Sequence, residues 1–478
     1  MAVQPPQETP PLRKFRVLKF LLGGTVLSSE LLVHLLQELD APQHRLTVYR
    51  NYYLGQQPIS FVSPESQKAI GNRLARLVVN VPKVVISSLA ARLRIIGLEG
   101  EPALWDEWLA ADLDQLSPAV HRTALLYGQS FVTVWGDGQN PTVSVESPQQ
   151  FQVVTDPATR RIEYGIKRWR TDKETFAVIY APDRVERWKA NQAGASTAAF
   201  ELQETLDNPL GVVPVARFLN SDLIADEPVS EIADILGLTD ALSKLTIDAM
   251  TGSEYMAKPR RYSTGTELRE VPRLDDDGNP VLEGGEPVMD LVNPFGDDDR
   301  FMIAENDQAK FGQLNGSTLD GYQTVAELIL SELCAVTGLA PHQLGVFHSN
   351  PASAEALKSQ EISLTSKAES KQAQFGRSWE TVGKLLHAVR NGVSPDSVEC
   401  SVIWGDPSVS SEAAMADAAM KLVDARILPV RFALMRLGYT QKQIAEIERI
   451  RAEEIVGMDQ IEQLTREAGY GREMGINL

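Results

Sequence analysis

The sequence predicts an α+β fold that is mainly helical. Apolar residues recur at helical spacing along most of the 478 residues, whereas residues 131–188 consist of short strands separated by turns. Hydrophobic residues make up 43% of the chain and charged residues 23%, which is typical of a globular protein and not of a disordered one. The two cysteines, Cys334 and Cys400, cannot form a disulfide framework, so a reducing compartment is expected.

The charge balance limits the possible partners. The chain has 46 Lys and Arg against 64 Asp and Glu, which gives a formal net charge of −18. Proteins that hold nucleic acid tightly neutralise its phosphates with clustered Lys and Arg. We therefore expect no tight DNA binding, although an acidic protein is compatible with DNA that slides past it. No stretch approaches the roughly 20 apolar residues that span a bilayer. No clear cleavage site follows the basic N-terminus, so a cytosolic start is expected and not export.

The first half of the chain changes from helices to strands. After a loose tail, helices are expected over 28–39, 44–54, 66–93, 105–113 and 117–127. Strands are expected over 131–135, 143–145, 151–154, 162–169, 176–180 and 185–188. Within 162–169, apolar and polar residues alternate, which indicates an antiparallel sheet with one solvated face.

An insertion of different composition separates two helical segments, 226–258 and 319–337. Residues 259–318 are rich in Pro, Gly and Asp, so we expect loops and short strands there. The run Asp275-Asp276-Asp277-Gly278-Asn279-Pro280 is similar to a calcium loop, but Pro280 stands where the loop needs Gly. The run is either a cation site or a solvated acidic turn. Asp297, Asp298 and Asp299 form either an exposed loop or a second binding patch.

The longest predicted helix spans residues 351–392. Asn350 can cap it, Pro351 fits its first turn, and Gly392 ends it. Its apolar stripe comprises Leu357, Leu364, Ala368, Phe375, Trp379, Val382, Leu386 and Val389. A rod of roughly 60 Å needs neighbours that cover this stripe, either from the same chain or from other subunits. Mixed charges on the polar side favour a solvated or salt-bridged face over a phosphate-binding one.

The segments on either side of this helix are less regular. Gly338 is a plausible left-handed stop for the preceding helix, and residues 338–350 have no clear period. There, His342 and His348 are either polar loop residues or contacts with a passing polymer. Residues 393–408 contain one strand, Val398–Trp404, which we expect to return to the earlier sheet. Residues 409–478 read as helical.

Motifs for the common catalytic chemistries are missing. The sequence contains no GxxxxGK[ST], no GxGxxG after a strand, no HExxH and no CxxC, and its six His residues are not closely paired. We therefore predict no catalytic residues, no metal site, no cofactor and no enzymatic activity. A DNA hydrolase or nuclease would need a convergent carboxylate or His site, and no spacing supplies one.

Four short motifs and the order of the elements resemble one known family. The motifs are Tyr52-Tyr53-Leu54-Gly55, Asn80-Val81-Pro82-Lys83, Gly128-Gln129-Ser130-Phe131 and Trp404-Gly405-Asp406-Pro407. Together with helices, a sheet, an insertion between two helices, a loop and a very long helix, they resemble the portal proteins of tailed bacteriophages, of the siphovirus type. The resemblance spans residues 28–454.

This resemblance implies a portal-protein fold and a role in genome transport. Its parts would be an N-terminal tail (1–27), a wing (28–225 and 393–408), stem helices (226–258 and 319–337), a clip (259–318), a tunnel loop (338–350), a long helix (351–392) and a crown (409–478). The family forms a ring, commonly a dodecamer, at one capsid vertex, through which double-stranded DNA is packaged and ejected. The alternative is another structural scaffold protein of a large viral assembly without a DNA pore.

The resemblance also assigns residues and partners. The DNA-facing tunnel loop would present Leu339, His342, Gln343, Leu344, Val346, Phe347, His348, Ser349 and Asn350. The clip would bind partners through Asp275, Asp276, Asp277, Asp297, Asp298 and Asp299. Subunits would meet along the long helix through Leu357, Leu364, Phe375, Trp379 and Val382. Expected partners are the large terminase, an adaptor or head-completion protein, the major capsid protein and a scaffolding protein, with no membrane. The protein would reside in the virion, and in the host cytoplasm during assembly.

Overall fold

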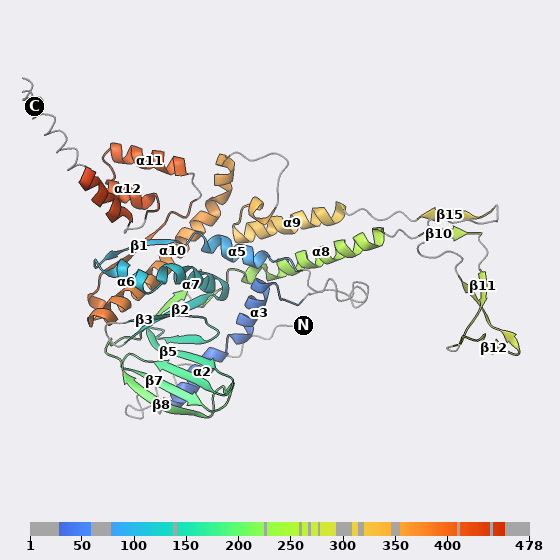
Figure 1. Cartoon of the computed structure of the whole chain (residues 1–478), viewed down its shortest axis with the longest axis horizontal. Coiled ribbons are helices and arrows are strands. Elements are labelled where there is room, and N and C mark those ends of the chain that lie inside the picture. Colours follow the sequence, from blue (N-terminus) through green and yellow to red (C-terminus); the bar gives the residue numbers. More distant parts are fainter. Residues whose placement is uncertain are drawn as a thin grey trace, which may run out of the picture. The chain divides into compact units, whose positions relative to one another are not determined.

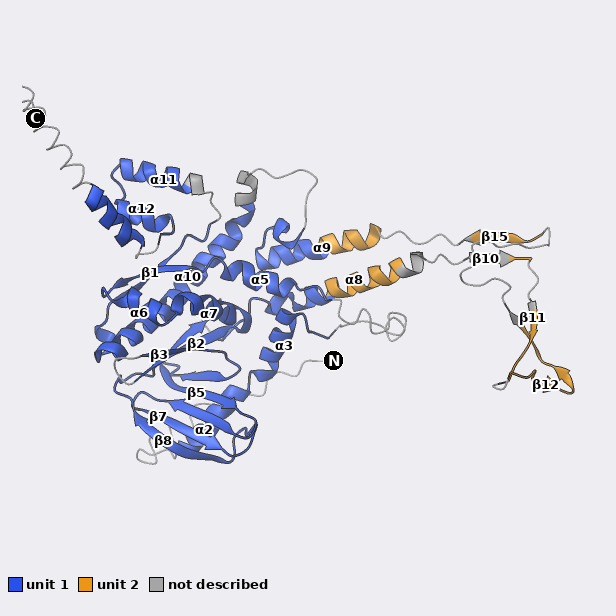
Figure 2. Cartoon of the chain, in the orientation of Figure 1, with its two compact units in different colours: residues 1–58, 78–240, 329–478 blue, residues 59–77, 241–328 orange. Residues whose placement is uncertain are grey.

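A computed structural model describes most of the chain. The described residues are 28–58, 78–136, 141–223, 227–257, 261–265, 269–275, 278–292, 308–313, 320–345, 354–408, 412–439 and 443–454. They fall into two compact units, of which the first contains residues 1–58, 78–240 and 329–478, and the second residues 59–77 and 241–328 (Figure 2).

The helices of the first unit largely follow the apolar spacing of the sequence. They are α2 (Ser28–Asp40), α3 (Gln43–Leu54), α5 (Val81–Ala90), α6 (Leu104–Ala110) and α7 (Leu113–Tyr127) (Figure 1). The predicted helix 66–93 is described only in its last part, because residues 59–77 lie outside the described residues. Asn80 caps α5 by accepting a hydrogen bond from the Lys83 N–H at 3.2 Å, and Pro82 occupies its first turn. Pro82 therefore begins a helix here instead of bending one.

A five-stranded antiparallel sheet forms one layer of this unit. Its strands, in spatial order, are β4 (Phe151–Thr155), β5 (Ile162–Arg170), β6 (Thr175–Tyr180), β7 (Arg184–Ala190) and β8 (Phe200–Asp207). Leucines of α2 pack on Ile166, Ala177 and Ile179, so this helix covers one face of the sheet (Figure 1). The edge strand β8 was not predicted, although Phe200, Leu202 and Leu206 stand on one side of it; most of its side chains are exposed, as expected at the edge of a sheet.

A three-stranded antiparallel sheet and the long helix form the centre of the unit. The sheet has the order β3 (Thr142–Glu146), β2 (Gln129–Trp135), β9 (Val215–Leu219), and α10 (Ala354–Asn391) packs against it. Trp379 of α10 meets Phe218 of β9 at 4.5 Å and Trp108 of α6 at 4.9 Å between ring centroids. Such edge-to-face aromatic pairs stabilise a core beyond the area they bury.

The strand that follows the long helix forms a sheet of its own. β16 (Cys400–Trp404) pairs antiparallel with β1 (Ile95–Gly100) in a two-stranded sheet. The prediction that this strand returns to the earlier sheet is therefore wrong. Its partner β1 was not expected, because a short segment with a central Gly97 shows no strand pattern. A side chain at Gly383 of α10 would lie 2.6 Å from Cys400 Sγ, so only Gly allows α10 to pack this closely on β16.

The second unit contains nested hairpin ladders. α8 (Leu236–Ala257), preceded by the 3₁₀ turn η2 (Ala233–Ile235), leads into it, and α9 (Asp320–Thr337) leads out. Between them, β10 (Arg261–Thr264) pairs with β15 (Lys310–Gln313), β11 (Arg269–Pro272) with β14 (Met289–Val292), and β12 (Leu282–Glu283) with β13 (Glu286–Pro287). All three pairs are antiparallel, and the outer ladder encloses the inner ones in the sequence.

The acidic run at Asp275 belongs to a tight turn. The Gly278 N–H donates to the Asp275 carbonyl at 3.0 Å, and the Asn279 N–H donates to Asp275 Oδ1 at 2.8 Å. Gly278 has a φ of 83°, which a residue with a side chain rarely adopts. Among the described residues, no group of three or more His, Cys, Asp or Glu side chains could hold a metal ion. Asp276 and Asp277, the other two carboxylates of the run, lie outside the described residues.

The C-terminal part of the described chain is helical. It contains α11 (Glu412–Asp424), α12 (Val430–Arg436) and a helical stretch over 443–454. In the described part of the chain, none of the helices combines the length and the apolar character that a membrane span requires.

Among the described residues, one histidine ring lies in the buried core. His121 of α7 is fully buried and stacks on Phe375 at 5.7 Å between ring centroids. Its Nε2 accepts a hydrogen bond from Trp379 Nε1 at 2.7 Å, which requires the neutral imidazole. Burial lowers the pKa of His121 to about 3.

Stability should therefore fall in mild acid. The unfolded chain protonates this imidazole near pH 6.5, whereas the folded protein keeps it neutral down to about pH 3. Between these values the unfolded state binds more protons, so the free energy of unfolding should drop by about 2 kcal/mol from pH 7 to pH 5. Urea unfolding at both pH values measures this. In the His121→Gln variant, whose side chain cannot be protonated, the free energy of unfolding should drop by about 2 kcal/mol less over the same pH range. An equal drop in the wild-type protein and in the variant would contradict the assignment.

Candidate functional site at the junction of α9 and α10

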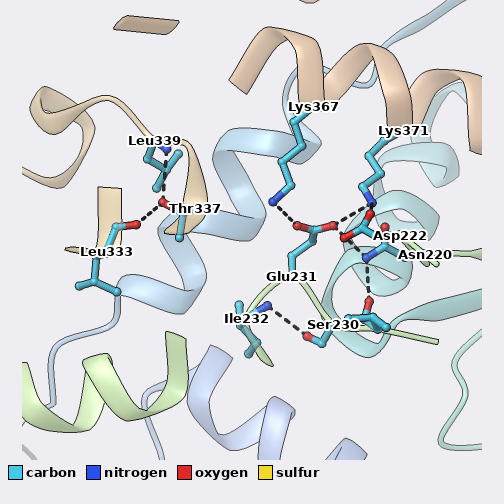
Figure 3. A network of polar contacts seen from close by, with 11 residues as sticks. Asn220, Asp222, Ser230, Glu231, Ile232, Leu333, Thr337, Leu339, Lys367 and Lys371 are labelled. Atoms are coloured by element: carbon cyan, nitrogen blue, oxygen red, sulfur yellow. Dashed lines mark hydrogen bonds and ion pairs between the residues drawn. The ribbon is translucent and has the colours of Figure 1, made fainter. Parts of the chain in front are cut away.

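The predicted tunnel loop begins with a tightly fixed helix end. Thr337, the last residue of α9, donates from Oγ1 to the Leu333 carbonyl at 2.7 Å and accepts the Leu339 N–H at 3.3 Å (Figure 3). Gly338 adopts a φ of 74°, as predicted for a left-handed helix stop. A Cβ at this position would lie 2.8 Å from Ser363 Oγ, so the chain turns directly against α10. These contacts fix where the segment starts.

The residues assigned to the DNA-facing loop have different environments. Leu339 is buried, with 3% of its surface exposed, so it anchors the segment instead of facing a channel. His342, Gln343 and Leu344 are half-buried in the 3₁₀ turn η3 (Pro341–Leu344). Val346, Phe347, His348, Ser349 and Asn350 lie outside the described residues.

The 3₁₀ turn η3 contacts the long helix through one carboxylate. His342 Nε2 lies 3.4 Å from Glu361 Oε1, and Gln343 Nε2 donates to the same oxygen at 3.4 Å. Both contacts are long, as expected for partners that share one acceptor. They nevertheless show that the two polar side chains of the turn are directed toward α10.

A second polar cluster, next to this junction, joins α10 to the segment that precedes α8. The Glu231 carboxylate, with 4% of the side chain exposed, forms ion pairs with Lys367 and Lys371 of α10 (Figure 3). Lys371 Nζ lies 3.2 Å from Glu231 Oε1 and 2.8 Å from Asp222 Oδ1. Asn220 Nδ2 donates to Glu231 Oε1 at 3.0 Å. Two cations and two carboxylates thus balance one another where α10 meets Asp222 and Glu231.

The electrostatics of this cluster favour its charged form. Burial alone would raise the pKa of Glu231, but the ammonium groups of Lys367 and Lys371 outweigh burial and hold this pKa below its usual range. The hydrogen bond from Lys371 lowers the pKa of Asp222 in the same direction. Both carboxylates therefore remain ionised at neutral pH, and the cluster acts as a fixed cross-link between distant segments.

The apolar stripe of the long helix is part of the chain's own core. Leu364, Phe375, Trp379 and Val382 are each at most 1% exposed within a single chain. The expectation that they form the contact between subunits therefore needs correction, because α6, β2, β9 and β16 of the same chain already cover this face. The side chain of Leu357 lies outside those that the structure describes.

The acidic clip residues are only partly described. Asp275 is exposed in the turn beside β11, in agreement with a surface role. Asp276, Asp277, Asp297, Asp298 and Asp299 lie outside the described residues. The clusters at Glu231 and Glu361 were not found from the sequence. Lys367, Lys371 and Glu361 were visible there as polar residues of the long helix, but their partners come from segments far away in the chain.

Removing one member of the Glu231 cluster should destabilise the protein strongly. Lys371→Met leaves Glu231 and Asp222 without the ammonium group that they share, and loss of one partner of a buried ion pair costs about 3 kcal/mol. The matched control is Arg377→Met on the same helix. The Arg377 side chain is 85% exposed, and within the described residues it forms an ion pair with Glu380. This control should cost less than about 1 kcal/mol in urea unfolding. Equal losses in the two variants would contradict a structural role for the cluster.

Comparison with known proteins places the chain in one family. The model of the family described as phage portal protein, SPP1 Gp6-like, matches residues 34–456. The portal protein of Mycobacterium phage L5 is 30% identical over 403 residues, 79% of each chain, and that of Mycobacterium phage D29 is 29% identical over 401 residues, 78% of each chain.

Solved structures from gene transfer agent particles show a weaker similarity. A chain from the neck of the native particle, computed with C12 symmetry, has 13% identity and a TM-score of 0.43, over 82% of this chain and 99% of that one. A chain from the virion of the native particle has 12% identity and a TM-score of 0.42, over 84% of this chain and 94% of that one. The family match and the mycobacteriophage relatives confirm the resemblance found in the sequence: the chain belongs to the SPP1 Gp6-like phage portal protein family and is a structural portal protein, not an enzyme.

Proposed function

We propose that copies of this chain close into a ring at one capsid vertex and that double-stranded DNA is packaged and ejected through its axis. The observation that carries this proposal is the match to the portal family over residues 34–456. Twelve subunits is the number that the resemblance implies. One heterologous contact, repeated around an axis until it closes, is sufficient to build such a ring.

The charge of the chain supports a passage that does not retain DNA. Strong neutralisation of phosphates releases counterions and holds DNA in place, which would oppose movement. A subunit with a net charge of −18 repels the phosphate backbone overall. A ring of these subunits would therefore let DNA move while the work of packaging comes from an ATP-hydrolysing partner.

The contact between subunits must lie outside the buried stripe of α10. Several large apolar side chains remain exposed elsewhere in the described chain, among them Ile362 on α10, Val336 on α9 and Phe432 on α12. In a ring these side chains would be covered by the neighbouring subunit. These exposed side chains replace the stripe as our proposal for the contact between subunits.

The segment 338–350 is our candidate for the DNA-facing loop. Because Leu339 and Ala340 are buried, the DNA-facing role falls on the residues that follow Ala340. Among these, His342 and Gln343 can reach toward solvent only by leaving Glu361. We assign residues 346–350 to the contact with DNA.

The clip, residues 259–318, is our candidate for the binding site of the large terminase and of an adaptor or head-completion protein. Within it, the side chains of β12 and β13 are exposed, and so is Asp275 in the acidic turn. The major capsid protein and a scaffolding protein would contact the wing. Assembly would take place in the host cytoplasm.

Replacing residues 346–350 with five Gly and Ser residues tests the DNA-facing role. The anchor formed by Thr337, Gly338 and Leu339 remains, so ring assembly should be unchanged. Packaged or retained DNA should fall at least tenfold in phage complementation, because the axial contact is lost. The matched control replaces Asp172 and Lys173, which are exposed in the turn between β5 and β6, with Gly and Ser. Wild-type DNA content in the loop variant would refute the assignment.

Shortening the clip tests its role in partner binding. Arg269 and Val292 are paired across β11 and β14, so deletion of residues 270–291 joins two positions that already face each other and keeps the β10–β15 ladder. The variant should form rings and lose at least tenfold in the capture of purified terminase and adaptor. Capture at the wild-type level by intact rings of this variant would show that the clip does not bind these partners.

A further inference from the structure

Arg92 joins segments that are far apart in the sequence. It follows α5, and 9% of its side chain is exposed. Its Nη2 donates to Glu361 Oε2 at 3.0 Å, and its Nη1 donates to Thr365 Oγ1 at 3.2 Å and to the Pro407 carbonyl at 2.7 Å. One planar guanidinium therefore contacts α10 twice and the segment after β16 once. Only the rigid fork of Arg supplies several directed donors in this way.

The backbone at Arg92 is fixed as well. Gln372 Nε2 donates to the Arg92 carbonyl at 3.2 Å and to the Gly405 carbonyl at 3.1 Å. The Gly405 N–H donates to the Arg94 carbonyl at 2.8 Å. Because α10 and the end of β16 hold the backbone on both sides, the guanidinium is held in position before it meets Glu361.

Glu361 divides its two oxygens between Arg92 and the turn η3. Oε2 accepts from Arg92, and Oε1 faces His342 Nε2 and Gln343 Nε2, each at 3.4 Å. The carboxylate is 12% exposed, so it depends on these partners for compensation of its charge. Without Arg92, the carboxylate would turn toward solvent or toward other donors and would no longer present Oε1 to η3.

We propose that Arg92 is a positioning residue for residues 338–345, the described start of the segment 338–350. Through Glu361, it sets how these residues lie against α10, and through the Pro407 carbonyl it ties the same point to the segment after β16. Arg92 acts on the turn η3 through the Glu361 carboxylate. The inference rests on the proposed function, which assigns the segment to DNA passage.

Hydrogen–deuterium exchange of the full-length chain tests this inference. Arg92→Gln and Glu361→Gln should each raise exchange in residues 338–345 about tenfold, because a charge-assisted contact that closes the turn is lost. Arg92→Lys keeps a charge beside Glu361 but not the fork, so its effect should be smaller than that of Arg92→Gln. Arg377→Gln, on the exposed side of the same helix, should leave exchange in this segment unchanged.

Two results would overturn the inference. One is unchanged exchange in residues 338–345 in both Gln variants. The other is an equal rise in residues 338–345 and along residues 374–391 of α10, which would indicate general loosening and not positioning. The exchange measurement needs neither DNA nor a ring. If the chain formed no ring, the proposed function would be refuted, but the comparison of exchange rates between variants would still test the role of Arg92.

Discussion

Burial of one face of α10 by the chain's own strands and helices is the constraint on which the first unit depends. The helix presents Phe375, Trp379 and Val382 inward, where they meet side chains from β9, α6 and α7. Burial of large apolar and aromatic side chains of this kind is the main favourable contribution to folding. A helix of 38 residues can therefore hold together sheets and helices from opposite ends of the sequence.

The polar side chains of the same helix contact the connecting segments that meet it. Lys367 and Lys371 hold the segment before α8 through Glu231, and Glu361 holds Arg92 and the turn η3. Buried ion pairs contribute little net stability compared with apolar packing, but they are costly to break and allow one arrangement of their partners. In this protein they lie where connecting segments meet the helix. The apolar face thus supplies stability, and the polar contacts specify how the chain leaves the core.

The sequence predicted the long periodic elements well and the short or exposed ones poorly. The stripe over 351–392 identified α10, whose described bounds are Ala354–Asn391. By contrast, β8 and β1 were missed, since β8 is an exposed edge strand in which polar residues predominate and β1 is short and contains Gly97. A stripe also shows that a face is buried without showing what buries it. This is why Trp379 was assigned to a neighbouring subunit, although Phe218 and Trp108 of the same chain cover it.

The sequence predicted where the candidate site lies in the chain, but it did not predict which residues contact one another there. The interruption at Gly338 marked the segment correctly, because a left-handed Gly ends a helix in a recognisable way. The partners of Glu361 and Glu231 could not be found, since a charged residue on a helix is compatible with solvent, with another subunit or with a buried counter-ion. Only the tertiary structure separates these environments.

The central claim is that copies of this chain surround an open axis through which DNA passes. Electron microscopy of the purified full-length chain tests it most directly. The claim predicts closed rings of uniform subunit number, with a continuous axial opening wide enough for a DNA duplex of about 20 Å. Particles that stay monomeric at assembly concentrations, or that close without an opening along their axis, would contradict it.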